Sequence, residues 1–228
     1  MLASGDLRDF VKTIAFLPDG YTGSLRVDIN DKDELVAARN FIILLVAFTF
    51  PPEKASNMIL HLWYSAFLPE LMVSSLREDI LPLTKDLTPF NQEDSSGHIM
   101  QGRWLCNNST LNAILPQRTW DQVVSCCSGV SNISYDDAVG RMRFVTLGHG
   151  RRDFRDRAAL RLPPSWRLSE LKFRKDGVLL PFGASNKVFN TPNPLVPPFS
   201  VFEISTNEEQ AFFRDCGRMA NARLCESA

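Results

Sequence analysis

Residues 4–50 read SGDLRDFVKTIAFLPDGYTGSLRVDINDKDELVAARNFIILLVAFTF. Apolar side chains on one face predict a helix over 6–17, ended by a Pro-Asp-Gly turn at 18–20. Residues 24–30 alternate apolar and polar side chains with the period of two that is typical of a β-strand near the edge of a sheet. A polar turn then leads into a helix over 34–50 that is hydrophobic nearly all round. This order predicts a Rossmann-like α/β fold, with a sheet flanked by helices.

The turns of such a fold are the places where a cofactor binds. Gly5 and Asp6 occupy the first strand-to-helix turn, and Asn30 and Asp31 follow about 25 residues later, where an acidic residue holds ribose hydroxyls in dinucleotide folds. The Gly-x-Gly-x-x-Gly fingerprint is missing, and Asp6 places a carboxylate where a phosphate would bind. Positively charged S-adenosylmethionine would tolerate Asp6 better than NAD. These four residues are therefore candidate S-adenosylmethionine ligands. The local alternative is a helix N-cap and a polar turn.

The composition is that of an ordinary globular chain. The chain has 228 residues and a net charge of −1, which argues against a nucleic-acid binder that uses its whole surface. The cysteines and histidines are too irregularly spaced for a disulfide framework or a zinc site, which predicts reduced thiols, an intracellular protein in the cytoplasm or nucleus, and no metal. They are Cys106, Cys126, Cys127, Cys216, Cys225, His61, His98 and His149. The apolar run 41–50 is shorter than the ~20 residues that cross a bilayer, so no membrane contact is expected.

The remaining sequence predicts further elements and a division into three parts. The expected helices cover 53–67, a short stretch ending near 81, 120–126, 135–147 and a tail segment from 207. The expected non-helical segments are an exposed loop over 84–97, a strand over 99–106, a hairpin of 171–174 with 178–182 around a Lys-Asp-Gly turn, and an extended linker over 191–198. The predicted parts are a Rossmann-like N-terminal half (1–96), a helical and hairpin half packed on it (97–195) and a loosely attached tail (196–228).

Two further groups of residues could carry chemistry. His61 lies on a predicted packed helix without an adjacent nucleophile, which favours a structural role, and no catalytic Ser/His/Asp or Cys/His order is present. The segment from 151 to 175 is basic, and it could bind an acidic partner or RNA. A solvated face with local ion pairs is the alternative. Its charged residues are Arg151, Arg152, Asp153, Arg155, Asp156, Arg157, Arg161, Arg167, Glu170, Lys172, Arg174 and Lys175.

Several of these motifs resemble a known family. Ser-Gly-Asp-Leu-Arg at 4–8, Asn30-Asp31 and Ala38-Arg39-Asn40, followed by His61-Leu62-Trp63-Tyr64, resemble the fungal domain of unknown function 4470. The same order is similar to the N-terminal domain of the dynein axonemal assembly factor 3 proteins. Residues 152–157, 162–167, 173–184 and 191–194 also resemble fungal members of this group. The resemblance implies a Rossmann-like, methyltransferase-like fold with no established reaction. Family members often carry a MYND-type zinc finger, whose Cys/His pattern this sequence does not contain.

Residues and resemblance together favour a non-catalytic protein-interaction or scaffold module with a protein partner and no bound cofactor. An S-adenosylmethionine-dependent methyltransferase is the first alternative. Binding of an acidic partner or RNA through 151–175 is the second, although the neutral overall charge argues against nucleic acid.

Overall fold

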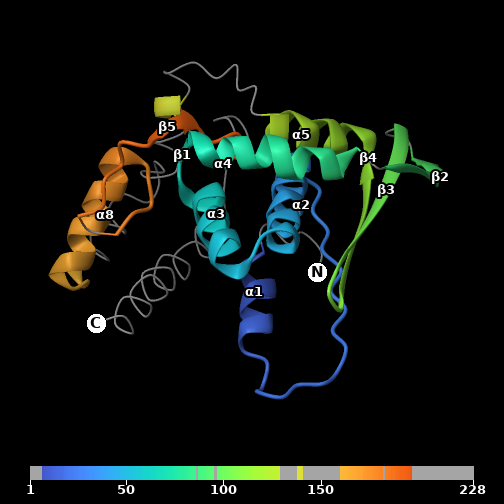
Figure 1. Ribbon diagram of the computed structural model, residues 1–228, viewed down its shortest axis with the longest axis horizontal. Coiled ribbons are helices and arrows are strands. Elements are labelled where there is room, and N and C mark those ends of the chain that lie inside the picture. Colours follow the sequence, from blue (N-terminus) through green and yellow to red (C-terminus); the bar gives the residue numbers. More distant parts are fainter. Residues whose placement is uncertain are drawn as a thin grey trace. The chain divides into compact units, whose positions relative to one another are not determined.

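The computed structural model describes residues 7–85, 87–94, 97–128, 138–140, 160–181 and 183–196. The chain forms two compact units (Figure 1). Unit 1 comprises Met1–Ile59 and Leu71–Val130, and unit 2 comprises Leu60–Glu70 and Ser131–Ala228. Both units contain helices and strands, so the predicted mixed α/β class is confirmed.

Unit 1 is mainly helical. Its helical segments are α1 (Arg8–Ala15), α2 (Glu34–Thr49), the part of α3 (Pro52–Tyr64) up to Ile59, most of α4 (Glu70–Ser75), the π-helical turn η1 (Leu76–Ile80), the 3₁₀ turn η2 (Leu81–Thr84) and α5 (Gln117–Ser128). The helices predicted over 6–17, 34–50, 53–67 and 120–126 are confirmed within a few residues.

Helix α2 is the centre of unit 1. The carboxylate of Asp33 accepts hydrogen bonds from the peptide N–H groups of Leu35 (2.9 Å) and Val36 (3.1 Å), which satisfies two of the free donors at the helix start. The buried residues of α2 are spread around the whole helix, as the sequence predicts, and α2 packs on α5, η1 and β3. An ion pair between Arg118 and Glu34 also joins α5 to α2.

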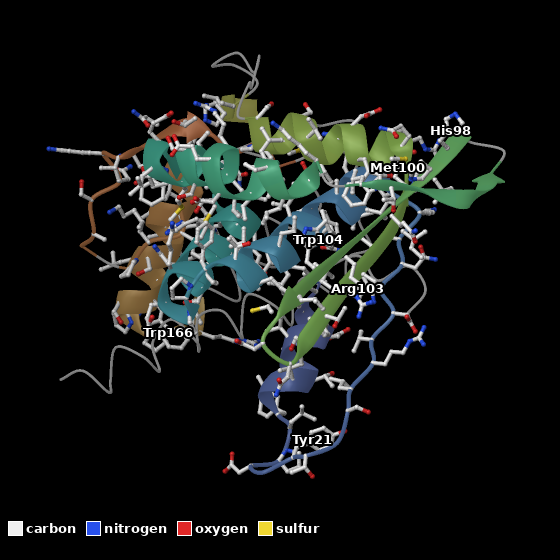
Figure 2. All side chains as sticks on the ribbon, turned by 45° about the vertical axis from the view of Figure 1, so that its right-hand side comes forward. Tyr21, His98, Met100, Arg103, Trp104 and Trp166 are labelled. Atoms are coloured by element: carbon white, nitrogen blue, oxygen red, sulfur yellow. The ribbon has the colours of Figure 1, made fainter. Side chains whose placement is uncertain are left out.

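A three-stranded antiparallel sheet completes unit 1, in the order β2–β3–β4. Its strands are β2 (Thr88–Asp94), β3 (Gly97–Cys106) and β4 (Ser109–Pro116). Strands β3 and β4 form a hairpin in which Cys106 faces Ser109. Asn107 has a φ of 49° in the two-residue turn, a conformation that asparagine tolerates better than most residues. Side chains alternate across the hairpin: Trp104 is partly buried against the helices, and its neighbour Arg103 is exposed (Figure 2).

An aromatic cluster joins this sheet to the helices of unit 1. The ring of Phe41 lies 5.1 Å from that of Trp104 and 4.9 Å from that of Trp120, the second pair edge to face. The indole of Trp104 donates to the carbonyl of Leu83, and that of Trp120 donates to the carbonyl of Met100. Each aromatic pair stabilises the packing by about 1 kcal/mol beyond the burial of its surface.

The described part of unit 2 contains a short two-stranded antiparallel sheet and one long helix. Strand β1 (Phe67–Pro69) pairs with β5 (Phe189–Pro192), and helix α8 covers Pro164–Asp176. Pro163 and Pro164 begin α8, where a missing N–H costs nothing. Gly177 ends it in the left-handed conformation (φ 68°) and donates from its N–H to the carbonyl of Phe173.

The predicted strand over 24–30 is wrong. The segment follows α1 as an irregular, extended stretch that runs beside the β3–β4 hairpin in both views (Figures 1 and 2). Both sheets in the described part of the chain are antiparallel, so a Rossmann-like parallel sheet is absent from that part. The alternation of 24–30 specifies an extended backbone, but a strand also requires a continuous ladder, and within this segment only Asn30 forms a β-bridge.

Three further predictions are wrong for identifiable reasons. Part of the polar loop predicted over 84–97 is β2, whose backbone pairs with β3. The hairpin predicted over 171–182 is the end of α8, because Gly177 serves as a helix C-cap instead of a turn residue. Part of the linker predicted over 191–198 is strand β5. The strand predicted over 99–106 is confirmed as β3.

The three-part division of the chain stays a prediction. Most of the helix expected over 135–147 and residues 197–228, which include nearly all of the predicted tail, lie outside the described residues.

Candidate interaction surface

The Asn30–Asp31 candidate lies in the turn that leads into α2. The carboxylate of Asp31 accepts a hydrogen bond from the peptide N–H of Asp33 (2.9 Å), and Asp33 in turn caps α2. Asp31 therefore has the local role expected of an acidic residue in a polar turn before a helix. Asn30 is exposed beside it. Gly5 and Asp6 lie outside the described residues, and the site of four candidate ligands stays a prediction.

A buried polar cluster lies where α3 meets β1 in unit 2. Nδ1 of His61 lies 2.9 Å from Oγ of Ser65, one helical turn further on. Ser65 Oγ also accepts a hydrogen bond from the peptide N–H of Leu179 (3.1 Å). The ring of His61 packs against that of Phe189, with 4.8 Å between their centroids. Burial lowers the pKa of His61 to about 4, so the imidazole is neutral at pH 7.

Asn193 completes this cluster from the other end of unit 2. Its side chain is fully buried, and its amide nitrogen donates to the carbonyls of Ser65 (2.7 Å), Leu62 (3.0 Å) and His61 (3.3 Å). Its amide oxygen accepts from the N–H of Leu195 (3.0 Å). Asn193 therefore satisfies carbonyls at the end of α3 that have no partner within the helix.

A Ser–His pair at hydrogen-bonding distance has the composition of a nucleophile and its base. Here the hydroxyl of Ser65 is fully buried and already accepts from Leu179, so a substrate cannot reach it in this conformation. The pair holds the end of α3 against the segment after α8, which agrees with the structural role expected for His61. Sequence reasoning missed Ser65, although its position four residues after His61 places both on one helix face.

The cysteines in the described part of the chain form no disulfide. Cys126 and Cys127 are buried in α5, and Cys106 is partly exposed at the end of β3. Burial, and to a lesser degree the neighbouring Cys126, raises the pKa of Cys127, so this thiol is protonated and a poor nucleophile. Cys216 and Cys225 lie outside the described residues.

The clearest exposed feature of unit 2 is one face of α8. Pro164, Leu168, Leu171 and Lys175 are spaced by four, three and four residues, which places them on one stripe of the helix, and all four are exposed. Leu168 is 47% exposed and Leu171 57%. We call these four residues the α8 stripe. The opposite side of α8 holds the buried Phe173, which anchors the helix in unit 2.

The basic side chains of α8 form two groups: those that contact other residues of unit 2, and those beside the α8 stripe. Arg174 pairs with Glu170 at 3.0 Å, with both side chains largely buried, and Lys172 Nζ donates to the carbonyl of Ala184. Arg167 and Lys175 lie beside the two exposed leucines. The predicted basic segment therefore contributes an apolar stripe with a positive border. Its residues 151–159, like His149, lie outside the described part of the chain.

No group of three or more His, Cys, Asp and Glu side chains in the described ranges is arranged to hold a metal ion. Among the helices of these ranges, none is long and apolar enough to span a membrane.

Comparison with known families supports the resemblance seen in the sequence. The model of a family described as a domain of unknown function, DUF4470, matches residues 1–68, so the predicted resemblance to this family is confirmed. The matched region includes α1, α2 and α3. Neither the curated proteins nor the solved structures gave a match.

Proposed function

We propose that this chain, whose residues 1–68 match a domain family of unknown function, is a non-catalytic protein-interaction or scaffold module. The observation that supports this proposal is the α8 stripe, with Leu168 and Leu171 exposed between Arg167 and Lys175. A partner segment with one or two apolar anchors flanked by Asp or Glu would bury the leucines and pair with the basic side chains.

The expected energy of this contact follows from the exposed area of the two leucines. Full burial of a leucine side chain contributes about 2 kcal/mol, and Leu168 and Leu171 each have roughly half of their surface left to bury. Removing both should therefore cost ~2 kcal/mol, roughly 30-fold in Kd.

Selection of peptides from a random display library on the purified chain tests the proposal. We expect enriched peptides to combine apolar and acidic residues, and calorimetry to show that Leu168→Ser/Leu171→Ser weakens their binding by roughly 30-fold. Leu105→Ser is the matched control, because Leu105 is an exposed leucine on β3 of unit 1. Peptides that bind the double variant as tightly as the wild-type chain would refute the assignment of the stripe.

An S-adenosylmethionine-dependent methyltransferase is the alternative function. It would use Gly5, Asp6, Asn30 and Asp31, and it requires Asp31 to give up its hydrogen bond to Asp33. Calorimetry with S-adenosylmethionine distinguishes the two proposals: binding that Asp31→Ala abolishes favours the enzyme. The absence of heat from a folded sample favours the interaction module.

Binding of RNA through the basic segment is the remaining alternative. Affinity for a single-stranded RNA or for heparin should then fall steeply between about 50 and 200 mM salt, as phosphate contacts require. Binding with a flat salt dependence would exclude this alternative.

Four further properties of the protein belong to this proposal. We propose an intracellular location from the reduced thiols, and a Rossmann-like arrangement, a fungal origin and an association with MYND-type zinc fingers from the family resemblance.

A further inference from the structure

The α8 stripe presents two exposed leucines between positive charges. Leu168 and Leu171 lie between Arg167 and Lys175 along α8. These two basic residues are eight positions apart, which is about 12 Å along a helix. Neither of their side chains forms an ion pair with another residue that the structure describes. The stripe therefore offers an apolar centre with an available positive charge at each end.

One segment of the chain's own sequence has the complementary order. Residues 208–215 read Glu-Glu-Gln-Ala-Phe-Phe-Arg-Asp, with three acidic side chains and one basic side chain. Phe212 and Phe213 lie between Glu208 and Asp215, which are about 10 Å apart in the helix that the sequence predicts from 207. Two aromatic anchors between negative charges match two leucines between positive charges at nearly the same spacing. Because each segment has the same sign at both ends, the charges match in either direction.

The chain is long enough for residues 208–215 to reach α8. The last described residue, Val196, is buried in unit 2, which also contains α8. Glu208 follows twelve residues after Val196, and an extended chain of that length spans up to about 40 Å. This reach exceeds both the ~20 Å length of α8 and the ~30 Å diameter of a small domain.

We propose that residues 208–215 occupy the α8 stripe of their own chain and compete there with external partners. This inference rests on the proposed function, because it takes the stripe to be the interaction surface. The two phenylalanines cover the two leucines, and the acidic side chains pair with the positive border of the stripe. A tethered segment is present at an effective concentration on the order of 1 mM. With an intrinsic Kd on the order of 100 µM, it would lower the affinity for an external partner roughly tenfold.

Binding of a free copy of the segment to variants of the full chain tests this competition. The probe is a fluorescently labelled peptide of residues 203–220 with blocked ends, followed by fluorescence anisotropy. We expect the wild-type chain to bind the peptide weakly, because the attached segment already occupies the stripe. Phe212→Ser/Phe213→Ser in the chain should release the stripe and tighten peptide binding roughly tenfold. Adding Leu168→Ser/Leu171→Ser to this released chain should weaken peptide binding again, by roughly 30-fold.

Charge reversal tests the border of the stripe. Arg167→Glu/Lys175→Glu in the released chain should weaken binding of the peptide by roughly tenfold, because like charges then meet at both ends. A peptide carrying Glu208→Lys/Asp215→Lys should regain affinity for this reversed stripe. Leu224→Ser is the matched control, because it changes an apolar residue of the same tail outside 208–215. Its affinity for the peptide should equal that of the wild-type chain.

The outcomes separate this inference from the proposed function. Equal affinity of the peptide for the wild-type chain and for Phe212→Ser/Phe213→Ser would overturn the inference. Release that depends on chain concentration would also overturn it, because it would indicate the tail of a second copy. If display-selected peptides bind the stripe and the 203–220 peptide does not, only the inference is wrong. If Leu168→Ser/Leu171→Ser weakens neither kind of peptide, the proposed function is wrong as well.

Discussion

Replacement of Asn193 tests the role of the buried polar cluster in unit 2. The side-chain amide donates to carbonyls at the end of α3, at distances of 2.7 to 3.3 Å, and accepts from the N–H of Leu195. Asn193→Ala removes both donors and the acceptor together. No water replaces them without opening the core, because the side chain is fully buried.

The magnitude follows from the number of bonds lost. Two amide hydrogens and one amide oxygen make at least three hydrogen bonds, each with a net value of about 1 kcal/mol. We therefore expect Asn193→Ala to lower the free energy of unfolding of unit 2 by about 3 kcal/mol. Asn193→Asp has nearly the same shape, but an ionised carboxylate has no donor and faces carbonyl oxygens. At pH 7 it should destabilise unit 2 more than alanine does.

Urea unfolding followed by hydrogen exchange and mass spectrometry measures this effect separately for each unit. Peptides covering 60–70 and 160–196 report on unit 2, and peptides covering 34–49 report on unit 1. Asn190→Ala is the matched control, since this asparagine is exposed in β5, three residues before Asn193, and should change stability by less than about 0.5 kcal/mol. An Asn193→Asp protein as stable as the wild type would refute the donor role of the amide.

Substitutions at three more positions test the packing of each unit. Burial lowers the pKa of His61 from 6.5 to about 4. Between pH 4 and pH 6.5 the unfolded chain therefore binds a proton at His61 more readily than the folded chain does. Unit 2 should accordingly lose ~2 kcal/mol of stability from pH 7 to pH 5. Urea titrations of His61→Gln should lack this loss, and an unchanged pH dependence would contradict it. Gly177→Ala should cost about 1 kcal/mol, because φ is 68° there, and Gly177→Asn should cost less in thermal unfolding. An added Cβ at Gly102 would overlap the ring of Trp104. Gly102→Ala should therefore lower the free energy of unfolding by about 2 kcal/mol and alter the near-ultraviolet circular dichroism. An unaltered spectrum would argue against this packing.

The helices of unit 1 are predictable from the sequence because their signals are local. Asp33 provides an N-cap directly before α2, and the apolar residues that follow are too numerous for a surface helix. The bounds of α2 therefore agree with prediction to within one residue. The sheets are less predictable, because pairing depends on partners that are distant in sequence. The polar residues of β2 and the proline-containing β5 read as loops until a partner strand is present.

Gly177 shows how one local signal fits two structures. Lys-Asp-Gly predicts a hairpin turn, but the left-handed conformation that glycine favours is also the one that ends a helix. The helix is favoured here by other features: Pro163 and Pro164 at its start, and the ion pair of Glu170 with Arg174 one turn apart. These features concern the start and the middle of the element, so they decide between the two structures only when all of 163–177 is considered together.

The candidate sites show the same contrast between signals that are local in sequence and contacts that only folding creates. The spacing of Asn30 and Asp31 fits a ribose site, but it fits equally the turn that begins α2, where Asp31 binds the N–H of Asp33. The cluster of His61 and Ser65 is visible as a spacing of four residues on a helix. Its third member, Asn193, is not predictable, because it lies 128 residues after Ser65 and only folding brings the two together.

Residues 24–30 show what an alternating pattern leaves open. Alternation of side chains fixes the conformation that a segment prefers and leaves its partner undetermined. The structure agrees with the preference, since the segment is extended, but within it Asn30 alone forms a β-bridge. The backbone conformation of this segment was therefore predictable from its own residues, whereas its pairing was not.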